Sequence, residues 1–269
     1  MTHQIHTLKR GHYLAPRYQT YDFGDFLIGH TKYDNPEKTG TWHLHERPMI
    51  SMVLYGGNLE KRKGKEIQRT TGCVNFYHAH EVHKNEYKVF PSIHIGLELE
   101  DKFLKKYDYR EADIEAAVQN CEDSQLIFLK LLKEAAINDE QAKSSIESIL
   151  LSFIQSSNEK ELNTYLPEWI KTVEEVLNDR WNENISLHDL AQETQVHPIT
   201  ISKHFKRYFH CTFGEYMRKL KVKQAITLLR STNLSLTETA YACGFADHSH
   251  FTRVFKATTG HLPKELAKI

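Results

Sequence analysis

Five histidines stand in two short groups in the first third of the chain, and their side chains could bind a metal ion. His43 and His45 lie one residue apart in "TWHLHE", and His78, His80 and His83 follow in "YHAHEVHKN". If the first group lies on a strand, His43 and His45 point to the same face, where His83 could complete a set of three neutral imidazoles. Such a set suits zinc, iron, manganese, nickel or copper, and nothing in the pattern selects among them. We expect His78 and His80 in the turn that leads to His83.

The sequence around these histidines predicts a series of short strands. Between about residues 20 and 100, stretches rich in β-branched and aromatic residues alternate with turn signals such as Gly56-Gly57-Asn58. Several short strands at this spacing predict a β-barrel or a β-sandwich. The charge run "KRKGKE" at 61–66 is expected at a solvated hairpin tip. The expected strands are "DFLIGH", "MISMVLYGG", "CVNFYH", "YKVF" and "SIHIGLELE".

From about Asp101 the hydrophobic period becomes helical. One segment, "SSIESILLSFIQSS", carries a strong amphipathic stripe. We expect this stripe either to pack on its own domain or to form a dimer interface. The polar, unpatterned residues 156–165 are expected to be a linker. The stripe residues are Ile146, Ile149, Leu150, Phe153 and Ile154.

The composition is that of a globular protein, with 40% hydrophobic and 26% charged residues among 269. No run of 18 apolar residues is present, so no spanning helix is expected. The first residues lack the apolar segment of a secretory signal. The four cysteines are scattered without a CxxC pair, which favours reduced thiols in a cytoplasmic protein.

The net charge is zero, but the charge is distributed unevenly. Residues 1–163 carry −3 and residues 164–269 carry +3. Within residues 197–230 there are eight basic side chains against one acid, Glu215. A solvated helix face usually mixes both signs, so this excess favours a surface that binds a polyanion. The basic residues are Lys203, Lys206, Arg207, Arg218, Lys219, Lys221, Lys223 and Arg230.

Residues 186–208, "SLHDLAQETQVHPITISKHFKRY", have the pattern of a helix-turn-helix. Ser186 is a good N-cap, and Asp189 three residues later gives a capping-box-like start. A short helix is expected there, followed by a tight turn that ends at Val196 and a second helix that opens at His197-Pro198. The side chains expected to face inward from the second helix are Ile201, Phe205 and Tyr208.

The same pattern recurs at 235–256, "SLTETAYACGFADHSHFTRVFK". The offset is 49 residues before the turn and 50 after it, because the second copy has one more residue. Gly244 supplies the turn. Between the copies one long helix is expected, and roughly 18 residues of it would span about 27 Å. Such a rod could place two recognition helices in successive major grooves, which recur about every 34 Å.

Residues 166–269 resemble the DNA-binding domain of the AraC/XylS family of bacterial transcription regulators. The family's most distinctive run, GF-x-D-x-S-x-F-x-R-x-F-K-x-x-x-G-x-x-P, is present whole. Two features differ from the family pattern. Gln195 stands where the first turn usually has glycine, so it must adopt the turn conformation itself, and "KELAKI" replaces the usual tyrosine-arginine after the last proline. The matching residues are Gly244, Phe245, Asp247, Ser249, Phe251, Arg253, Phe255, Lys256, Gly260 and Pro263.

The resemblance implies that the second helix of each unit enters a major groove, where residues in its N-terminal half reach base edges. Phosphate contacts are expected further along these helices. For Arg253, base contact and phosphate contact or bracing of the fold are both open. The expected base-reading residues are Ile199, Thr200, Ser202, Lys203, His248, Ser249, Thr252 and Arg253, and the expected phosphate contacts are Lys206, Arg207 and Lys256.

The strand-rich part is similar, in pattern more than in residues, to the small cupin-type β-barrel that such regulators often carry. Cupins place H-x-H after one glycine and a later histidine after another, and here Gly40 precedes His43 while Gly72 precedes His83. The acidic residue expected four or five positions after the second histidine is missing. His43, His45 and His83 therefore have three interpretations: a divalent-metal site, hydrogen-bonding groups for an organic effector, or a vestigial site without a ligand.

Together these patterns predict an α+β multidomain protein. The expected domains are a cupin-like β-barrel sensor domain at 1–100, a helical dimerisation or packing segment at 101–155, a linker at 156–165 and an AraC-type DNA-binding domain at 166–269. The expected function is sequence-specific transcription regulation, with recognition helices at about 197–208 and 247–257 and an N-terminal domain that senses a small-molecule or ion effector, dimerises, or does both. The resemblance also implies promoter DNA, a homodimer partner and RNA polymerase as partners, no membrane, and a cytoplasmic, nucleoid-associated location, with activation and repression both open.

Two other functions are kept as alternatives. The first is a DNA-binding protein that needs no effector. The second is a metal-dependent cupin enzyme, against which the missing acidic ligand and the duplicated helix-turn-helix both count. We therefore expect no catalytic activity.

Overall fold

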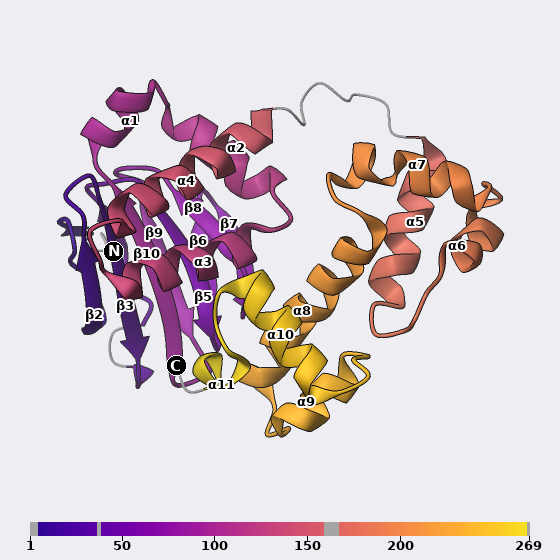
Figure 1. Cartoon of the computed structure of the whole chain (residues 1–269). Coiled ribbons are helices and arrows are strands. Elements are labelled where there is room, and N and C mark those ends of the chain that lie inside the picture. The colour runs from indigo at the N-terminus through magenta and orange to yellow at the C-terminus, as the bar shows by residue number, and fades with distance from the viewer. Residues whose placement is uncertain (1–4, 37–38, 159–166, 268–269) are drawn as a thin grey trace. The chain divides into compact units, whose positions relative to one another are not determined.

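The computed structural model describes residues 5–36, 39–158 and 167–267, and the chain divides into two compact units at residues 160 and 161. Among the described residues, the N-terminal unit contains ten strands and four helices and the C-terminal unit contains seven helices, and Figure 1 labels most of them. The sheet-rich domain followed by a helical domain confirms the predicted fold class. The division falls within the predicted linker, most of which lies outside the described residues.

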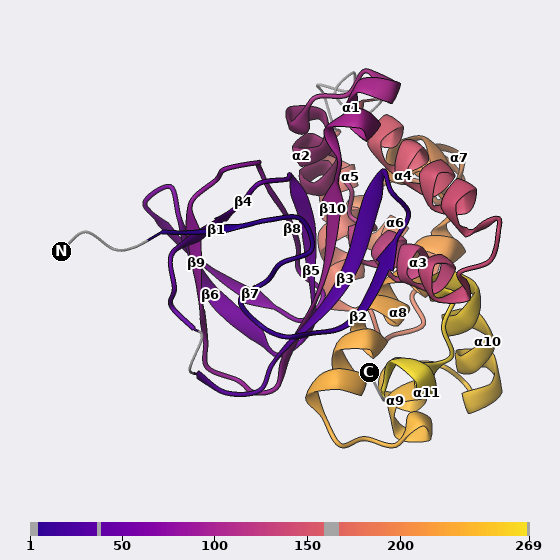
Figure 2. The ribbon, with the colours of Figure 1, turned by 90° about the vertical axis from the view of Figure 1, so that its left-hand side faces the viewer.

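Two five-stranded sheets face each other in the N-terminal unit (Figure 2). In the first sheet the strand order is β1 (His6–Leu8), β4 (His43–His45), β9 (His83–Tyr87), β6 (Gly57–Arg62) and β7 (Lys65–Thr70). In the second sheet it is β2 (Arg17–Asp22), β3 (Phe26–Tyr33), β10 (Ser92–Leu99), β5 (Met49–Tyr55) and β8 (Val74–Tyr77).

The sequence predicted the positions of the apolar strands of the second sheet, but it did not predict the polar strands of either sheet. Strand β10 is buried along its whole length at the centre of its sheet. The expected hairpin tip at 61–66 is confirmed by the β6–β7 pair. The prediction of a strand at "YKVF" is wrong beyond Tyr87, where β9 ends. Pro91, which follows this segment, has no backbone N–H to donate to a neighbouring strand. Strands β2, β6 and β7 carry many polar residues, so a search for hydrophobic periodicity does not detect them.

Four helices follow the sheets: α1 (Asp101–Tyr107), α2 (Glu111–Asn120), α3 (Ser124–Ile137) and α4 (Ala142–Asn158). Helices α2, α3 and α4 lie on the outer side of the second sheet (Figure 2). Helix α4 packs against α2 and α3, and Ile146, Leu150 and Phe153 of its stripe are fully buried within this single chain. These stripe residues thus pack on their own domain, which is the first of the two expected uses. Helix α4 also runs to Asn158, three residues into the expected linker.

The C-terminal unit is entirely helical in its described residues. It contains α5 (Glu168–Asp179), α6 (Leu187–Thr194), α7 (Pro198–Phe209), α8 (Phe213–Ser231), α9 (Leu236–Ala242), α10 (His248–Thr259) and α11 (Pro263–Leu266). The pairs α6–α7 and α9–α10 are the two predicted helix-turn-helix units, and α8 is the predicted rod between them. None of the described helices combines the length and the apolar character needed to span a membrane.

Candidate functional site

The first helix-turn-helix begins with a reciprocal cap and turns at a non-glycine residue. The Ser186 hydroxyl accepts a hydrogen bond from the Asp189 backbone N–H, and the Asp189 carboxylate accepts one from the Ser186 N–H. Gln195 adopts a left-handed conformation with φ of 55°, as the missing glycine required. Phe205 is buried and fixes helix α7 to the domain core. The exposed face of α7 therefore has a fixed orientation.

The second unit repeats this arrangement with a glycine in the turn. Ser235 and Glu238 form the same reciprocal cap at the start of α9. Gly244 has φ of 68°, a conformation that side-chain-bearing residues rarely adopt. Phe251 and Phe255 are fully buried and hold α10 in place.

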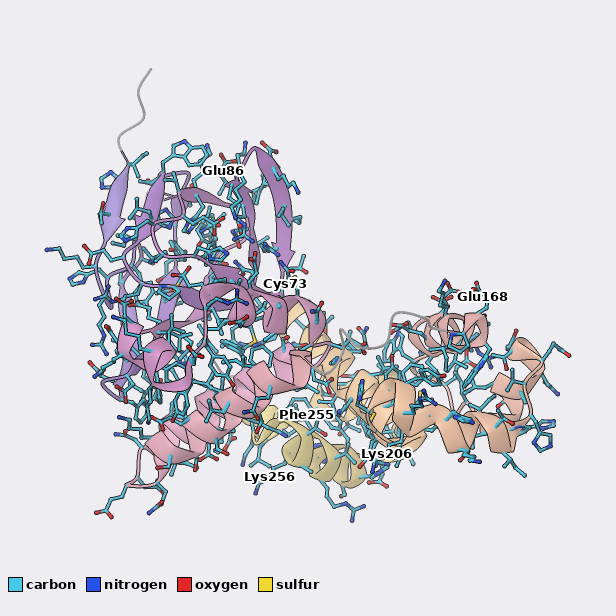
Figure 3. All side chains as sticks on the ribbon, turned by 90° about the horizontal axis from the view of Figure 1, so that it is seen from above. Cys73, Glu86, Glu168, Lys206, Phe255 and Lys256 are labelled. Carbon is cyan, nitrogen blue, oxygen red and sulfur yellow. The ribbon has the colours of Figure 1, made fainter. Side chains whose placement is uncertain are left out.

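The structure places every residue predicted to contact DNA at the surface of α7 or α10. Ile199 has an exposed fraction of 70%, which is unusual for a large apolar side chain. Lys206 on α7 and Lys256 on α10 are also exposed, and Figure 3 labels both. His248 and Thr252 are half-buried, and the other predicted contacts are Thr200, Ser202, Lys203, Arg207, Ser249 and Arg253, all of them exposed.

The basic excess in residues 197–230 is smaller at the surface than the sequence indicated. Lys221 and Arg230 are buried, with exposed fractions of 8% and 7%. They cannot contribute to a polyanion-binding surface, so counting them there was wrong. The helical spacing of α8 could have indicated that Lys221 is buried. Lys221 lies four residues after Met217 and four before Ala225, which are both buried.

Lys221 instead joins the two helix-turn-helix units from the middle of α8. Its ammonium donates a hydrogen bond of 2.8 Å to the Gly244 carbonyl, in the second turn, and lies 3.5 Å from the Asn184 side-chain oxygen, just before the first unit. Burial lowers the pKa of this ammonium group. Beside it, a Cβ on Gly244 would lie 2.0 Å from the Asn182 carbonyl oxygen. The turn of the second unit is therefore in close backbone contact with the segment that leads into the first unit, a feature that the sequence reasoning missed.

Replacing Lys221 with methionine is expected to lower the free energy of unfolding of the C-terminal domain by about 1 to 3 kcal/mol, the cost of a buried polar group that loses its partner. Methionine keeps the length of the side chain but cannot donate to Gly244. Urea unfolding measures the change. Arg218→Met, at an exposed cation on the same helix, is the matched control and should change stability by less than about 0.5 kcal/mol. Equal effects of the two changes would contradict a bridging role for Lys221.

Comparison with known proteins matches the sequence of this domain to a family. Residues 190–269 fit the family model described as a helix-turn-helix domain. These residues form a helix-turn-helix domain of the AraC type.

Relatives of the AraC-type domain are transcription regulators by name. The HTH-type transcriptional activator RhaR of Mannheimia succiniciproducens is 32% identical over 89 residues, which are 33% of this chain and 32% of that protein. The uncharacterized HTH-type transcriptional regulator YijO of Escherichia coli is 28% identical over 95 residues, 35% of this chain and 34% of that protein. The matches thus span about a third of the length of these curated relatives.

Two solved structures are similar at low identity. ToxT of Vibrio cholerae, solved with an unsaturated fatty acid bound, is 16% identical with a TM-score of 0.36, over 93% of this chain and 96% of that chain. The DNA-binding domain of AdpA, solved with a target DNA, is 19% identical with a TM-score of 0.36, over 38% of this chain and 92% of that chain.

In the N-terminal unit, the structure brings His43, His45 and His83 together and leaves His78 and His80 outside. His43 and His83 are cross-strand partners on β4 and β9. One nitrogen from each of the three rings lies within 4.8 Å of those of the other two, and all three residues are buried. His78 instead contacts two carboxylates of α2, and His80 is exposed in the preceding turn.

The three clustered histidines are neutral at pH 7. Burial and the nearby His83 ring lower the pKa of His43 to about 3, and burial lowers that of His83 to about 4. Burial and its two histidine neighbours also hold the pKa of His45 well below its ordinary value. Neutral imidazoles keep a lone pair for a ligand. The cluster can thus accept a metal ion or a hydrogen-bond donor.

Proposed function

We propose that this protein is a sequence-specific, DNA-binding transcriptional regulator that reads double-stranded promoter DNA with α7 and α10. The observation that carries the proposal is the pair of capped helix-turn-helix units. Each presents an exposed polar and basic helix face above a buried phenylalanine anchor. Helices of this kind read DNA from the major groove.

The length of α8 suits two successive grooves. Its 19 residues span about 28 Å at the α-helical rise. Successive major grooves on one face of a duplex lie about 34 Å apart, a distance that moderate tilts of the two recognition helices would make up. The contact between Gly244 and the segment at Asn182 supports a fixed spacing, because it leaves the two units little room to move independently.

The two classes of predicted contact have different roles in this proposal. Thr200, Ser202, Lys203, Ser249 and Arg253 lie near the N-terminal halves of their helices and reach bases, together with Ile199, His248 and Thr252. Lys206, Arg207 and Lys256 lie one or two turns later and bind phosphate, which gives affinity and register without sequence information.

In this proposal the N-terminal unit is the sensing domain of the regulator. In this proposal the protein works as a cytoplasmic homodimer on the bacterial nucleoid and contacts RNA polymerase at its promoters. The support is the two-domain organisation and the names of the relatives of the C-terminal domain. The dimer interface in this proposal does not use the buried stripe of α4.

Replacing Lys203 or Arg253 with alanine should weaken binding to the specific site by about 1 to 3 kcal/mol, or roughly 5- to 150-fold, with little effect on random DNA. Lys206→Ala and Lys256→Ala are the matched variants, at exposed basic residues of the same two helices. These should weaken binding to all sequences alike and lower the slope of log K against log salt by about 1.

The measurement is fluorescence anisotropy with the full chain, on DNA from its own promoter region and on a scrambled duplex. Equal losses on both duplexes in Arg253→Ala would make Arg253 a phosphate contact. If the unmodified chain binds no selected sequence more tightly than the scrambled duplex at moderate salt, the proposed function is wrong.

A further inference from the structure

Two of the three imidazoles in the cluster are oriented as metal-ligating histidines usually are. The Nδ1–H of His43 donates to the Thr41 carbonyl over 2.9 Å, and the Nδ1–H of His83 donates to the Glu81 carbonyl over 2.9 Å. These bonds fix the tautomer that leaves the Nε2 lone pair available, as in known metal sites. Within the described part of the chain, His83 Nε2 is buried without a hydrogen-bond partner. An unpaired buried nitrogen is costly unless a ligand completes it.

The size of the cavity favours an ion over an organic molecule. The space that these histidines line has a volume of about 40 Å³. Organic ligands of ordinary size occupy pockets of about 300 to 1,000 Å³. The Tyr13 side chain is one of those that line this small cavity. Its ring packs against Gly29, where a Cβ would lie 2.9 Å from the Tyr13 hydroxyl. A metal ion with one or two waters fits this volume.

The distances between the three ligand nitrogens are somewhat larger than the distances expected around a bound ion. At metal–nitrogen distances of about 2.1 Å, two nitrogens of a tetrahedral site lie about 3.4 Å apart. The three nitrogens here lie within 4.8 Å of one another. Binding would therefore draw the widest pair of these nitrogens together by up to about 1.4 Å.

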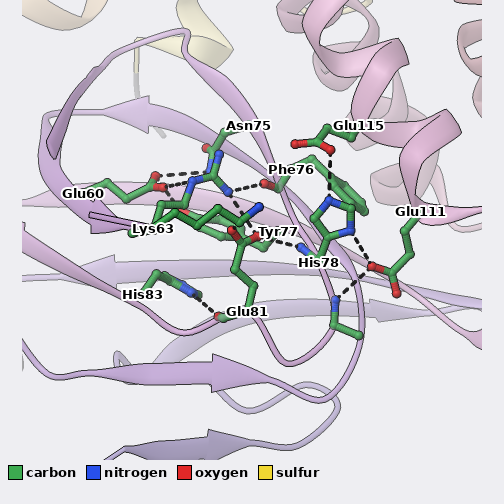
Figure 4. Close-up of polar contacts among 12 residues, drawn as sticks. Glu60, Lys63, Asn75, Phe76, Tyr77, His78, Glu81, His83, Glu111 and Glu115 are labelled. Carbon is green, nitrogen blue, oxygen red and sulfur yellow. Dashed lines mark hydrogen bonds and ion pairs between the residues drawn. The ribbon is translucent and has the colours of Figure 1, made fainter. Parts of the chain in front are cut away.

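The loop between β8 and β9 connects this cluster to helix α2, and Figure 4 shows the part of this connection that runs from His83 to Glu111 and Glu115. At the cluster, the His80 N–H donates to the His45 carbonyl and His83 donates to the Glu81 carbonyl. Within the loop, the His78 N–H donates to the Glu81 carboxylate. The short loop is thus bonded to two of the three clustered histidines.

At its other end the loop is bonded to α2. The His78 ring lies between two carboxylates, with Nδ1 2.8 Å from Glu111 and Nε2 3.0 Å from Glu115. The Ala79 N–H also donates to Glu111. Burial opposes protonation of His78, but the bonds to Glu115 and Glu111 outweigh it and raise the pKa of His78. Helix α2 in turn packs against α4, the last helix before the linker.

We propose that His43, His45 and His83 bind one divalent transition-metal ion between the sheets, and that the loop at 78–83 transmits its occupancy to helix α2 through His78, Glu111 and Glu115. The metal is then the signal that the N-terminal domain senses. The signalling step rests on the proposed function in DNA binding, whereas the metal site does not.

The site is tested by metal analysis of the full chain, produced without a histidine tag, treated with a chelator and then equilibrated with Zn²⁺ or Co²⁺. We expect one equivalent per chain by mass spectrometry and visible absorption bands from bound Co²⁺. His43→Asn and His83→Ala should lose the ion, whereas His80→Asn, at the exposed histidine of the same loop, should keep it. Circular dichroism of the metal-free variants shows whether they are folded. Less than about a tenth of an equivalent in the unmodified chain, or full retention in both folded variants, overturns the site.

The signalling step is tested by DNA affinity with and without Zn²⁺. We expect a change of about fivefold or more in the unmodified chain and in His80→Asn, within the usual range of coupling between two sites. In His78→Ala we expect the metal to bind but the DNA affinity no longer to respond. An equal response in His78→Ala overturns the route through His78, and no response in the unmodified chain overturns the signal. Loss of specific DNA binding under all conditions would contradict the proposed function alone, because metal binding is measured separately.

Discussion

Replacing Gly244 with alanine is expected to lower the free energy of unfolding of the C-terminal domain by about 2 to 5 kcal/mol. The left-handed backbone conformation costs about 1 to 2 kcal/mol for a residue with a Cβ. The added Cβ would also lie 2.0 Å from the Asn182 carbonyl oxygen and 3.0 Å from the Lys221 ammonium nitrogen, so the backbone must shift. A crowded site of this kind costs about 1 to 3 kcal/mol more.

The same substitution should weaken binding to a promoter that carries both half-sites, because the shift separates the two units that Lys221 joins. Hydrogen exchange of the full chain measures the local stability, and anisotropy measures the DNA affinity. Gly64→Ala is the control for backbone strain alone, since Gly64 has φ of 72° but a Cβ added there would have no heavy atom within 4 Å. Should Gly244→Ala cost no more than Gly64→Ala, close contact between the units is refuted.

Replacing Glu60 with alanine is expected to lower the free energy of unfolding of the N-terminal domain by about 3 to 5 kcal/mol. The Glu60 side chain is fully buried and lies 2.7 Å from the Arg62 Nε and 3.0 Å from the Arg69 Nε. The Tyr77 hydroxyl also donates to it over 3.1 Å. Alanine would remove the negative charge between two largely buried guanidinium groups and leave Arg62 only its longer ion pair with Glu81, at 3.4 Å. Removing one partner of a buried ion pair in this way is strongly destabilising.

This substitution also reaches the histidine cluster, because the Tyr77 ring stacks on His83 at a centroid distance of 4.2 Å. We therefore expect weaker metal binding as well as lower stability. Urea unfolding measures the stability, and Glu86→Ala is the control, since Glu86 pairs with Lys84 in the same sheet but at the surface. A surface pair contributes about 0 to 1 kcal/mol. A cost for Glu60→Ala as small as that of Glu86→Ala would show that the buried carboxylate does not stabilise the fold.

The duplicated helix-turn-helix could be predicted because its signals are local. The cap at Ser186 and the turn at Gln195 act over a few residues, and the spacing that repeats them at Ser235 and Gly244 is visible in the sequence. A cap or a left-handed turn depends on its own few residues more than on distant ones. The polar strands β6 and β9 could not be predicted in this way, because their burial comes from pairing with each other in the middle of a sheet.

The sequence alone was enough to predict that two helix-turn-helix units follow a strand-rich domain, and to name the three histidines that could act together. The folded chain was needed to show that Lys221 is a buried bridge instead of a surface cation, and that His43 stands opposite His83 across 40 residues of chain beside a cavity of about 40 Å³. The reason is physical: helix caps and periodicity are set by neighbours in sequence, whereas burial, register and free volume are set by residues that meet only when the chain is folded.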